Sequence, residues 1–327
     1  MSGEQARSRS STPTSESSSE STPASAKKIV LVTGGSGFIG RPALPLLVER
    51  GYEVWVARAS ASRGDLPAGV REIQADLLRA EDLDRLFATV KPTHLLHLAW
   101  DVTHGQFWKS PENLRWVAAS LELTRRFAEN GGKRAVFAGT CAEYDWSVGR
   151  CVEDETPLKP ATLYGVAKNS LHEVARNFFK QQGLSYAWGR IFLLYGPGEN
   201  PKRLVPSVIA SILSGQPARC TEGTQLRDFL HVDDVASAFV AMLDSEIQGA
   251  VNIASGQPVR LRDVTTRIVE LMRRPDLLAL GAIPMPAGDP PVLTADASRL
   301  AGLGWKPRYT LEEGLTQTIE WWKSSGA

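Results

Sequence analysis

The sequence predicts an α/β fold, with a doubly wound parallel sheet in its N-terminal half and a smaller mixed α/β domain after it. Two observations lead to this prediction. From residue 28 onward, short apolar runs alternate with helical stretches, which is typical of parallel strands joined by crossover helices. After about residue 196, proline and glycine become more frequent and the alternation ends. We therefore expect a parallel-sheet domain at 28–190 and a smaller domain over most of 191–327, with about 228–255 returning to the sheet.

The expected strands are short apolar runs, and the expected helices fill the intervals between them. In chain order the strands are Ile29–Val32, Glu53–Ala57, Glu72–Gln74, His94–Leu98, Ala135–Ala138 and Ser185–Arg190. The helices are expected near 38–49, 81–89, 111–129 and 164–182. Gly183 follows the last of these, where a glycine commonly ends a helix.

The composition is that of an ordinary globular chain. Of its 327 residues, 43% are hydrophobic and 22% are charged, and the net charge of +1 gives no bulk attraction to nucleic acid or to an anionic membrane. No apolar run reaches the ~18 residues that a transmembrane helix needs. Three scattered cysteines, Cys141, Cys151 and Cys220, indicate a reducing compartment, so we expect a cytoplasmic protein without disulfides. No metal site is expected.

Residues 1–27 differ from the rest of the chain. Ten of the first 26 residues are serine, and almost none is apolar. Such a segment cannot bury enough surface to offset the entropy lost on ordering, and it lacks the apolar stretch of a secretory signal. We expect a disordered leader, with a phosphorylated or regulatory tail as the alternative.

The spacing Gly34-x-x-Gly37-x-x-Gly40 lies between the first expected strand and the first expected helix. In that place glycines permit a tight turn, a close approach of backbone to phosphate, and close packing of helix on strand. The helix N-terminus adds free N–H donors for a pyrophosphate. The motif therefore predicts a dinucleotide site. Its further expected contacts are Phe38 and Ile39 within the motif, and Leu98 and Ala99 after the fourth strand.

The second strand ends at Arg58, with no acidic residue at the position that would bind the ribose 2′-hydroxyl of NAD. An arginine there suits the 2′-phosphate of NADP, and Ser60 and Arg63 lie close behind it. We therefore expect NADP(H) to be preferred, with NAD(H) possible and a surface arginine as the alternative. Asp76 and Leu77, after the third strand, are expected to contact adenine or to form a simple turn.

Tyr164 and Lys168 are four residues apart, so they share one face of a helix. A nearby ammonium and a cationic nicotinamide favour the phenolate, which lets the tyrosine exchange a proton with a substrate oxygen. Lys168 can also bind the nicotinamide ribose. Thr140, at the carboxyl end of the fifth strand, is the candidate to orient that oxygen, or else it only caps the strand. Its neighbour Cys141 is either a reactive substrate contact or a small packing residue.

Together these motifs resemble the extended short-chain dehydrogenase/reductase family, in its NAD(P)-dependent nucleotide-sugar epimerase/dehydratase/reductase branch. The resemblance covers about 28 to 322. It rests on the glycine motif, His97-Leu98-Ala99, Thr140 with Tyr144 four residues later, Tyr164-x-x-x-Lys168, Gly189–Pro197, Arg227–Val235 and Leu303–Pro307.

The resemblance implies a Rossmann-like N-terminal domain and a smaller domain that clamps a nucleoside-diphosphate sugar. It further implies that Arg227 meets the diphosphate, a suitable role for a forked cation. Asn113 would lie near the cofactor, and the stretch beginning at Arg203 would line the sugar cleft. Members often dimerise through the helices at 111–129 and 164–182, so we expect a homodimer.

The departures from the family pattern reduce the number of reactions that the resemblance allows. The 4,6-dehydratases of this family carry an Asp-Glu-type pair directly after the active-site threonine, and here those positions hold Cys141 and Ala142. A dehydratase is therefore not expected, and Glu143, one place later, is expected to point elsewhere. Trp100 and His104, after the fourth strand, are expected to touch the sugar or to pack the loop.

Three functions follow. The first is NADPH-dependent reduction of a 4-keto-6-deoxy nucleotide sugar in deoxysugar biosynthesis, with Tyr164 as the acid. The second is an NAD-dependent nucleotide-sugar 4-epimerase, which uses the same three residues. The third is a non-catalytic nucleotide-binding regulator, since a fold alone does not prove catalysis; the intact set Thr140, Tyr164 and Lys168 argues against it.

Overall fold

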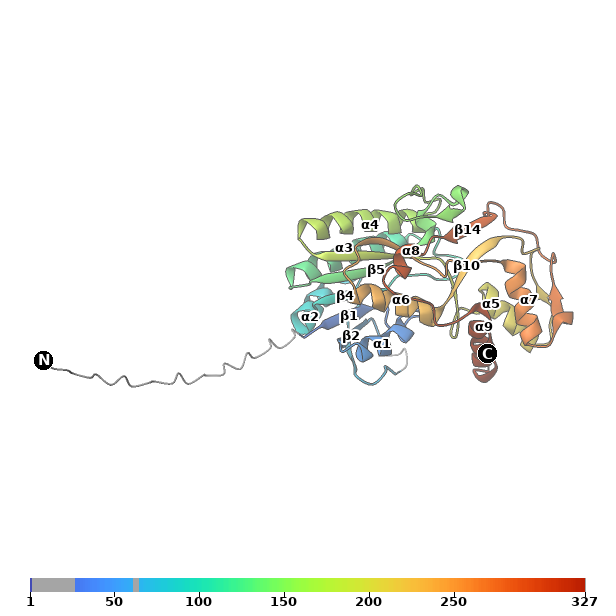
Figure 1. Ribbon diagram of the computed structural model, residues 1–327, viewed down its shortest axis with the longest axis horizontal. Helices are drawn as coiled ribbons and strands as arrows, with labels where there is room; N and C mark the ends of the chain where they lie inside the picture. Colours follow the sequence, from blue (N-terminus) through green and yellow to red (C-terminus); the bar gives the residue numbers. More distant parts are fainter. Residues whose placement is uncertain (2–26, 61–64, 327) are drawn as a thin grey trace.

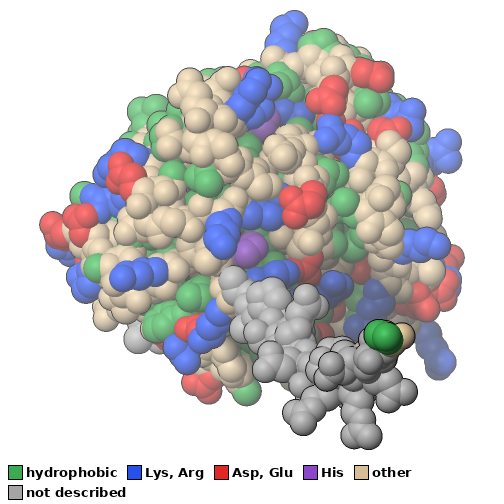
Figure 2. Space-filling view, turned by 60° about the vertical axis from the view of Figure 1, so that its left-hand side comes forward, with side chains coloured by type: hydrophobic (Ala, Val, Ile, Leu, Met, Phe, Trp, Pro, Cys, Tyr) green, Lys and Arg blue, Asp and Glu red, His purple; other side chains and the backbone are tan. Residues whose placement is uncertain are grey.

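The computed structural model describes residue 1, residues 27–60 and residues 65–326 (Figure 1). The expected disordered leader and Arg63 therefore lie outside the described residues, apart from Met1 and Lys27 at the two ends of the leader. Figure 2 shows acidic and basic side chains interspersed over the visible face, in keeping with the small net charge.

Seven parallel strands form the central sheet, in the order β11-β7-β5-β4-β1-β2-β3. The strands are β1 (Ile29–Thr33), β2 (Glu53–Arg58), β3 (Val70–Gln74), β4 (His94–His97), β5 (Arg134–Thr140), β7 (Ser185–Ile191) and β11 (Gly249–Ile253). All six expected strands are present, and the order reverses beside β1, as in a doubly wound sheet. The predicted Rossmann-like fold class is confirmed.

Helices cover both faces of this sheet (Figure 1). They are α1 (Gly40–Glu49), α2 (Ala80–Val90), α3 (Glu112–Glu129), α4 (Leu163–Gln181) and α6 (Val232–Asp244). Along β1 the side chains alternate, so that Val30 and Val32 join the core that contains α1 and α6, while Leu31 joins the core that contains α2, α3 and α4. Gly183 follows the end of α4 with a positive φ of 67°, a conformation that favours glycine.

A second, smaller unit contains most of the remaining elements. Its strands are β6 (Arg150–Cys151), β8 (Leu193–Tyr195), β9 (Ala218–Arg219), β10 (Leu226–His231), β12 (Pro258–Arg260), β13 (Leu278–Ala279) and β14 (Val292–Ala295). Its helices are α5 (Leu204–Leu213), α7 (Leu261–Leu271) and α9 (Leu311–Ser324), whereas α8 (Ser298–Ala301) packs against β11 and places Leu300 in the core that contains α1 and α6. Residues of α5, α7 and α9 share one buried apolar cluster. Within the described part of the chain, no helix is both long and apolar enough to cross a bilayer.

The chain passes between the two units several times. After β5 it enters a 3₁₀ turn, Cys141–Glu143, and reaches β6 in the second sheet. After β10 it returns through α6 to β11, which pairs with β7. These crossings place the carboxyl edge of the parallel sheet against the second unit, which is where ligands bind in open α/β sheets.

Candidate active site

The turn between β1 and α1 is built for close backbone contacts. Gly34 has a φ of 71°, and a Cβ on it would lie 2.7 Å from the Ala99 nitrogen and 2.8 Å from the Leu98 carbonyl carbon. A Cβ on Gly40 would lie 2.2 Å from the Gly34 oxygen. The expected contacts in the motif and after β4 are therefore adjacent in space. Because these glycines leave the backbone of the turn uncovered, it fits a dinucleotide pyrophosphate at the N-terminus of α1.

Arg58 does not lie on an open loop. Its side chain is only 3% exposed, and Nη1 donates to Glu72 Oε2 at 2.9 Å, across the β2–β3 pair. A 2′-phosphate would therefore have to share this guanidinium with a carboxylate. Asp76 forms a local turn, since its Oδ1 accepts a hydrogen bond from the Leu78 nitrogen at 3.0 Å.

Thr140 and Tyr164 are brought together at the carboxyl end of β5. The Thr140 Oγ1 accepts a hydrogen bond from the Ala142 nitrogen at 3.2 Å, and the Thr140 side chain lies near enough to Tyr164 to influence its pKa. Burial raises the pKa of Tyr164 well above its ordinary value, and the Thr140 side chain only partly opposes this shift. A phenol is protonated at neutral pH even without such a shift, so Tyr164 holds a proton that it can donate.

Lys168 lies one turn further along α4, and it is also buried. Its Nζ donates to the Ala138 carbonyl oxygen on β5 at 2.9 Å, and it lies 3.9 Å from the centroid of the Trp100 ring. Burial lowers the pKa of Lys168 to about 7, while the negative charge of Glu143 opposes this shift. The Ala138 carbonyl oxygen and the face of the Trp100 ring are favourable contacts for the protonated form of Lys168.

Aromatic side chains enclose Tyr164. The ring centroids of Phe107, Trp108 and Trp100 lie 4.9, 5.7 and 6.5 Å from that of Tyr164, all with edge-to-face geometry. Trp100 Nε1 donates to Asn113 Oδ1 at 2.9 Å, so its indole N–H is already satisfied. The same holds for Trp146 Nε1, which donates to the Cys141 oxygen at 2.8 Å. The surroundings of Tyr164 are therefore largely apolar.

Several other expected site residues have structural partners. Asn113 also donates to the carbonyl oxygens of Phe107 and Ser110, so it holds the loop that covers Tyr164. Burial raises the pKa of the Cys141 thiol to about 12, so this cysteine is an unreactive thiol in a small apolar cluster. His104, half-buried, has no hydrogen-bond partner for Nδ1 among the described residues.

The two expected substrate arginines lie in the second unit. Arg227, on β10, is buried and pairs through Nη2 with Asp289 Oδ1 at 2.6 Å. Arg203 is exposed at the N-terminal end of α5, with its guanidinium carbon 5.7 Å from the Phe107 ring centroid. Its positive charge acts to lower the pKa of Tyr164, which places Arg203 on the same side of the site.

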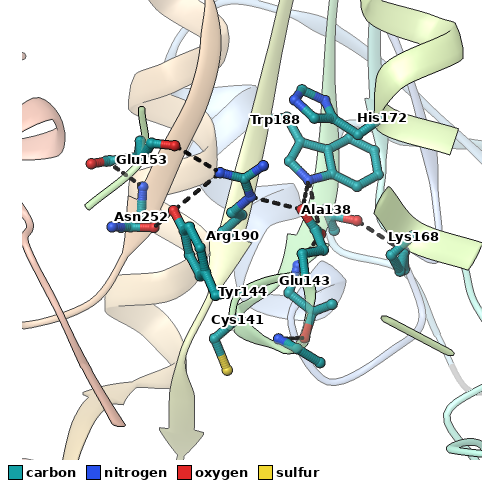
Figure 3. Close-up of polar contacts among 12 residues, drawn as sticks. Ala138, Cys141, Glu143, Tyr144, Glu153, Lys168, His172, Trp188, Arg190 and Asn252 are labelled. Atoms are coloured by element: carbon teal, nitrogen blue, oxygen red, sulfur yellow. Dashed lines mark hydrogen bonds and ion pairs between the residues drawn. The ribbon is translucent and has the colours of Figure 1, made fainter. Parts of the chain in front are cut away.

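Sequence reasoning missed two groups of residues around the site. The first is the pair Phe107 and Trp108, which lie in an irregular loop without periodic spacing. The second is the pair Trp188 and Arg190 on β7, whose side chains bond to the Glu143 carboxylate (Figure 3). The Glu143 carboxylate is buried and points toward β7. The unusually high number of tryptophans, nine in the chain, was the one available signal for the aromatic enclosure.

Comparison with known proteins gives a consistent result. Residues 30–254 match the model of the family described as the NAD dependent epimerase/dehydratase family. GDP-L-fucose synthase 1 of Arabidopsis thaliana is 28% identical over 315 residues, which cover 90% of this chain and 92% of that protein. A UDP-glucose 4-epimerase of Corynebacterium glutamicum is 27% identical over 305 residues, which cover 86% and 91%.

Solved structures match over a similar extent. The structure of MoeE5 in complex with UDP-glucose and NAD aligns with a TM-score of 0.79 at 33% identity, covering 91% of this chain and 99% of that one. The NAD complex of UDP-glucose 4-epimerase from Thermus thermophilus aligns with a TM-score of 0.80 at 26% identity, covering 91% and 99%.

Proposed function

Because the chain belongs to the NAD dependent epimerase/dehydratase family, we propose that it catalyses the NADPH-dependent reduction of a 4-keto-6-deoxy nucleoside-diphosphate sugar. The observation that carries this proposal is the buried Tyr164, which lies near Thr140 and is enclosed by aromatic rings. Relatives named as GDP-L-fucose synthase and UDP-glucose 4-epimerase support a nucleotide sugar as the substrate class.

Each of the three catalytic residues has a separate task. When bound, the reduced nicotinamide supplies a hydride to the C4 carbon. Tyr164 donates its phenolic proton to the C4 oxygen, and the hydroxyl of Thr140 orients that oxygen. Lys168 stabilises the phenolate that remains, until a proton from solvent restores the phenol. Reduction starts from a protonated tyrosine, which is the ordinary state of this side chain at neutral pH.

The apolar enclosure favours a 6-deoxy sugar. C6 is attached to C5, the ring carbon next to C4, so the group at C6 comes close to the rings around Tyr164. A methyl group is compatible with Phe107 and with the indoles of Trp100 and Trp146, whose N–H groups already have acceptors. A hydroxyl group packed against these three rings would lose its water without gaining a partner from them, which costs roughly 1–3 kcal/mol.

Water elimination is not part of this proposal. The two positions after Thr140 hold Cys141 and Ala142, and neither can act as an acid or base, since burial raises the pKa of the thiol. The nearest carboxylate, Glu143, is tied to Arg190 at 2.7 Å. The 4-keto-6-deoxy substrate must therefore come from a preceding dehydration by another enzyme.

The cofactor site fits a dinucleotide, and we infer that it prefers NADP(H). Gly34, Gly37 and Gly40 would hold the pyrophosphate at the N-terminus of α1, and Leu98 and Ala99 would border it. The NADP(H) preference rests on Arg58, whose guanidinium a 2′-phosphate would share with Glu72.

The alternative is a 4-epimerase that retains NAD and returns the hydride to the opposite face of C4. The pairing of Arg58 with Glu72 favours this alternative, because it partly neutralises the arginine on which the NADP(H) preference depends. The same three proposed catalytic residues serve both reactions. Net consumption of reduced cofactor therefore distinguishes a reductase, which consumes it, from an epimerase, which does not.

The test is to mix the purified protein with 4-keto-6-deoxy sugars on several nucleotides and to follow the oxidation of NADPH and NADH. We expect stoichiometric loss of NADPH with one substrate. No loss with any of them, together with NAD recovered from the denatured protein, would favour the epimerase.

A further inference from the structure

Glu143 lies behind the catalytic threonine and is completely buried. Its carboxylate accepts hydrogen bonds from three donors: the Thr140 nitrogen at 2.8 Å, Trp188 Nε1 at 3.0 and 3.1 Å to the two oxygens, and Arg190 Nε at 2.7 Å. Figure 3 shows the contacts with Trp188 and Arg190. The first donor is the backbone of the proposed catalytic residue itself. The carboxylate therefore joins the end of β5 to two side chains of β7.

The arginine that neutralises Glu143 is itself held in place. Arg190 is 1% exposed, and its Nη1 donates to the hydroxyl of Tyr144 at 3.1 Å and to the Glu153 carbonyl oxygen at 3.3 Å. Tyr144 in turn donates to Asn252 Oδ1 at 2.8 Å, on β11. The carboxylate thus has a fixed position relative to three strands of the sheet.

Gly139 also belongs to this arrangement. A Cβ at Gly139 would lie 2.0 Å from Trp188 Nε1, so only glycine lets the indole reach the carboxylate at this point. The residue before the catalytic threonine is therefore adapted to the Glu143 contact.

Two reciprocal hydrogen bonds fix both the backbone and the side chain of Thr140. The Thr140 nitrogen donates to Glu143, while the Ala142 nitrogen donates to Thr140 Oγ1. Because Oγ1 accepts from within the turn, its own proton is directed away from the turn, and Tyr164 lies near enough for Thr140 to influence its pKa. The turn therefore sets the direction in which the threonine hydroxyl donates.

The buried ion pair of Glu143 and Arg190 is not needed for stability alone, because a protein with well-packed apolar residues of similar volume in place of such a pair is often equally stable or more stable. An apolar residue at 143 would nevertheless leave the Thr140 nitrogen without its acceptor. We propose that Glu143 is a positioning residue for the reaction, acting through Thr140 while Arg190 neutralises it. This inference rests on the proposed role of Thr140, and it holds for ketoreduction and epimerisation alike.

The test compares two double variants that differ only in the acceptor offered to Thr140. Glu143→Gln/Arg190→Met keeps an oxygen facing the Thr140 nitrogen, and Glu143→Leu/Arg190→Met does not, while both remove the buried charges. We expect kcat of the leucine variant to be about 10²-fold below that of the glutamine variant, with KM changed less than about threefold. Equal kcat values in the two variants would overturn the proposal.

A background that lacks only the Thr140 hydroxyl shows whether Glu143 acts through Thr140. With Thr140→Val added, the glutamine and leucine variants should have the same kcat, because the acceptor no longer has a hydroxyl to position. A difference that persists would contradict the inference. Tyr52→Phe is the control: it removes the hydrogen bond from the Tyr52 hydroxyl to Asp244 Oδ1, outside this network, and should lower thermal stability while kcat stays near the wild-type value.

Two readouts remain decisive if a variant folds poorly or if the proposed function fails. Should the leucine variant not fold, Glu143→Gln/Arg190→Met alone must keep kcat within about tenfold of wild type, and a larger loss would overturn the proposal. Should the wild type turn over no nucleotide sugar, the proposed function fails. Hydrogen exchange at the Thr140 amide then decides the positioning claim: exchange should be faster in the leucine variant than in the glutamine variant, and equal rates would contradict the claim.

Discussion

Burial shifts the pKa values of the two proposed catalytic residues on α4. It raises the pKa of Tyr164 and lowers the pKa of Lys168 to about 7, against the effect of the Glu143 charge on the lysine. A tyrosine is protonated at neutral pH with or without this shift, which suits a reduction, in which the substrate oxygen must gain a proton.

Replacing Tyr164 by phenylalanine removes only the proton donor. We expect kcat to fall by about 10²–10⁴-fold, the range typical of a general acid, while the affinity for the nucleotide sugar stays nearly unchanged. Turnover rates and calorimetric titration of the nucleotide sugar measure the two effects. Full activity in Tyr164→Phe would remove this residue from the mechanism.

The lowered pKa of Lys168 predicts that the free energy of unfolding depends on pH. Between about pH 7 and the ordinary lysine pKa of 10.5, the unfolded chain holds a proton that the folded chain has released. The free energy of unfolding should therefore rise with pH across this window. Lys168→Met lacks this titrating group. The free energy of unfolding of the wild type, relative to that of the variant, should therefore increase between pH 7 and pH 10. Urea unfolding of both proteins across this range tests it; parallel curves would contradict it.

Arg58 and Glu72 make the cofactor preference adjustable. Glu72→Gln removes the carboxylate that shares the guanidinium, so we expect the ratio of kcat/KM for NADPH to that for NADH to rise roughly tenfold, about the value of one charge-assisted hydrogen bond. Arg58→Glu should shift the ratio toward NADH. If neither variant changes the ratio, Arg58 does not bind the 2′-phosphate.

Among the elements, the β1–α1 turn depends most directly on particular residues. The Gly40 backbone lies so close to the Gly34 oxygen that any side chain would force the turn open. Gly37 approaches the same oxygen less closely, since a Cβ there would lie 3.1 Å away. The start of helix α1 and the shape of the proposed pyrophosphate-binding turn therefore depend on the close contact between Gly40 and the Gly34 oxygen.

Gly40→Ala should open this turn. We expect a loss of about 1–3 kcal/mol of stability from overpacking and at least a tenfold weaker affinity for NADPH, measured by thermal unfolding and by fluorescence titration. Gly37→Ala is the control, with a smaller effect on both. Wild-type affinity in Gly40→Ala would show that the turn does not hold the pyrophosphate.

The elements were largely predictable from the sequence because their signals are local. The apolar runs at β1, β2, β4, β5 and β7 each gave a strand with ends within one or two residues of the expectation. The exact ends depend on pairing with neighbours; Arg134 and Thr140 extend β5 because they face Ser185 and Ile191 on β7. The two-residue strand β6 depends on β14, far away in the chain, and no local pattern could indicate it.

The site was predictable where its residues belong to one motif. Thr140, Tyr164 and Lys168 were found by position and spacing. The partner of Glu143 lies 47 residues away on another strand, and the pairing of Arg58 with Glu72 depends on strand register. Such contacts are set by tertiary structure, so single-sequence patterns do not contain them.

At the scale of the whole molecule, the family match confirms the resemblance drawn from the motifs. The carboxyl edge of the parallel sheet faces the second unit, which contributes Arg203 and Arg227 to the proposed substrate cleft. Helices α3 and α4 pack together and leave Leu114, Val166 and Val174 exposed, a surface that supports the predicted homodimer. The homodimer itself stays a prediction.

The most direct measurement is the fate of a labelled hydride. The protein is incubated with NADPH that carries deuterium at the transferable position and with the 4-keto-6-deoxy nucleotide sugar that it accepts. The proposed reduction predicts one deuterium at C4 of each product molecule, with one NADPH oxidised per sugar. Product that contains no deuterium, formed without loss of NADPH, would contradict the reductase and indicate internal return of the hydride, as in an epimerase.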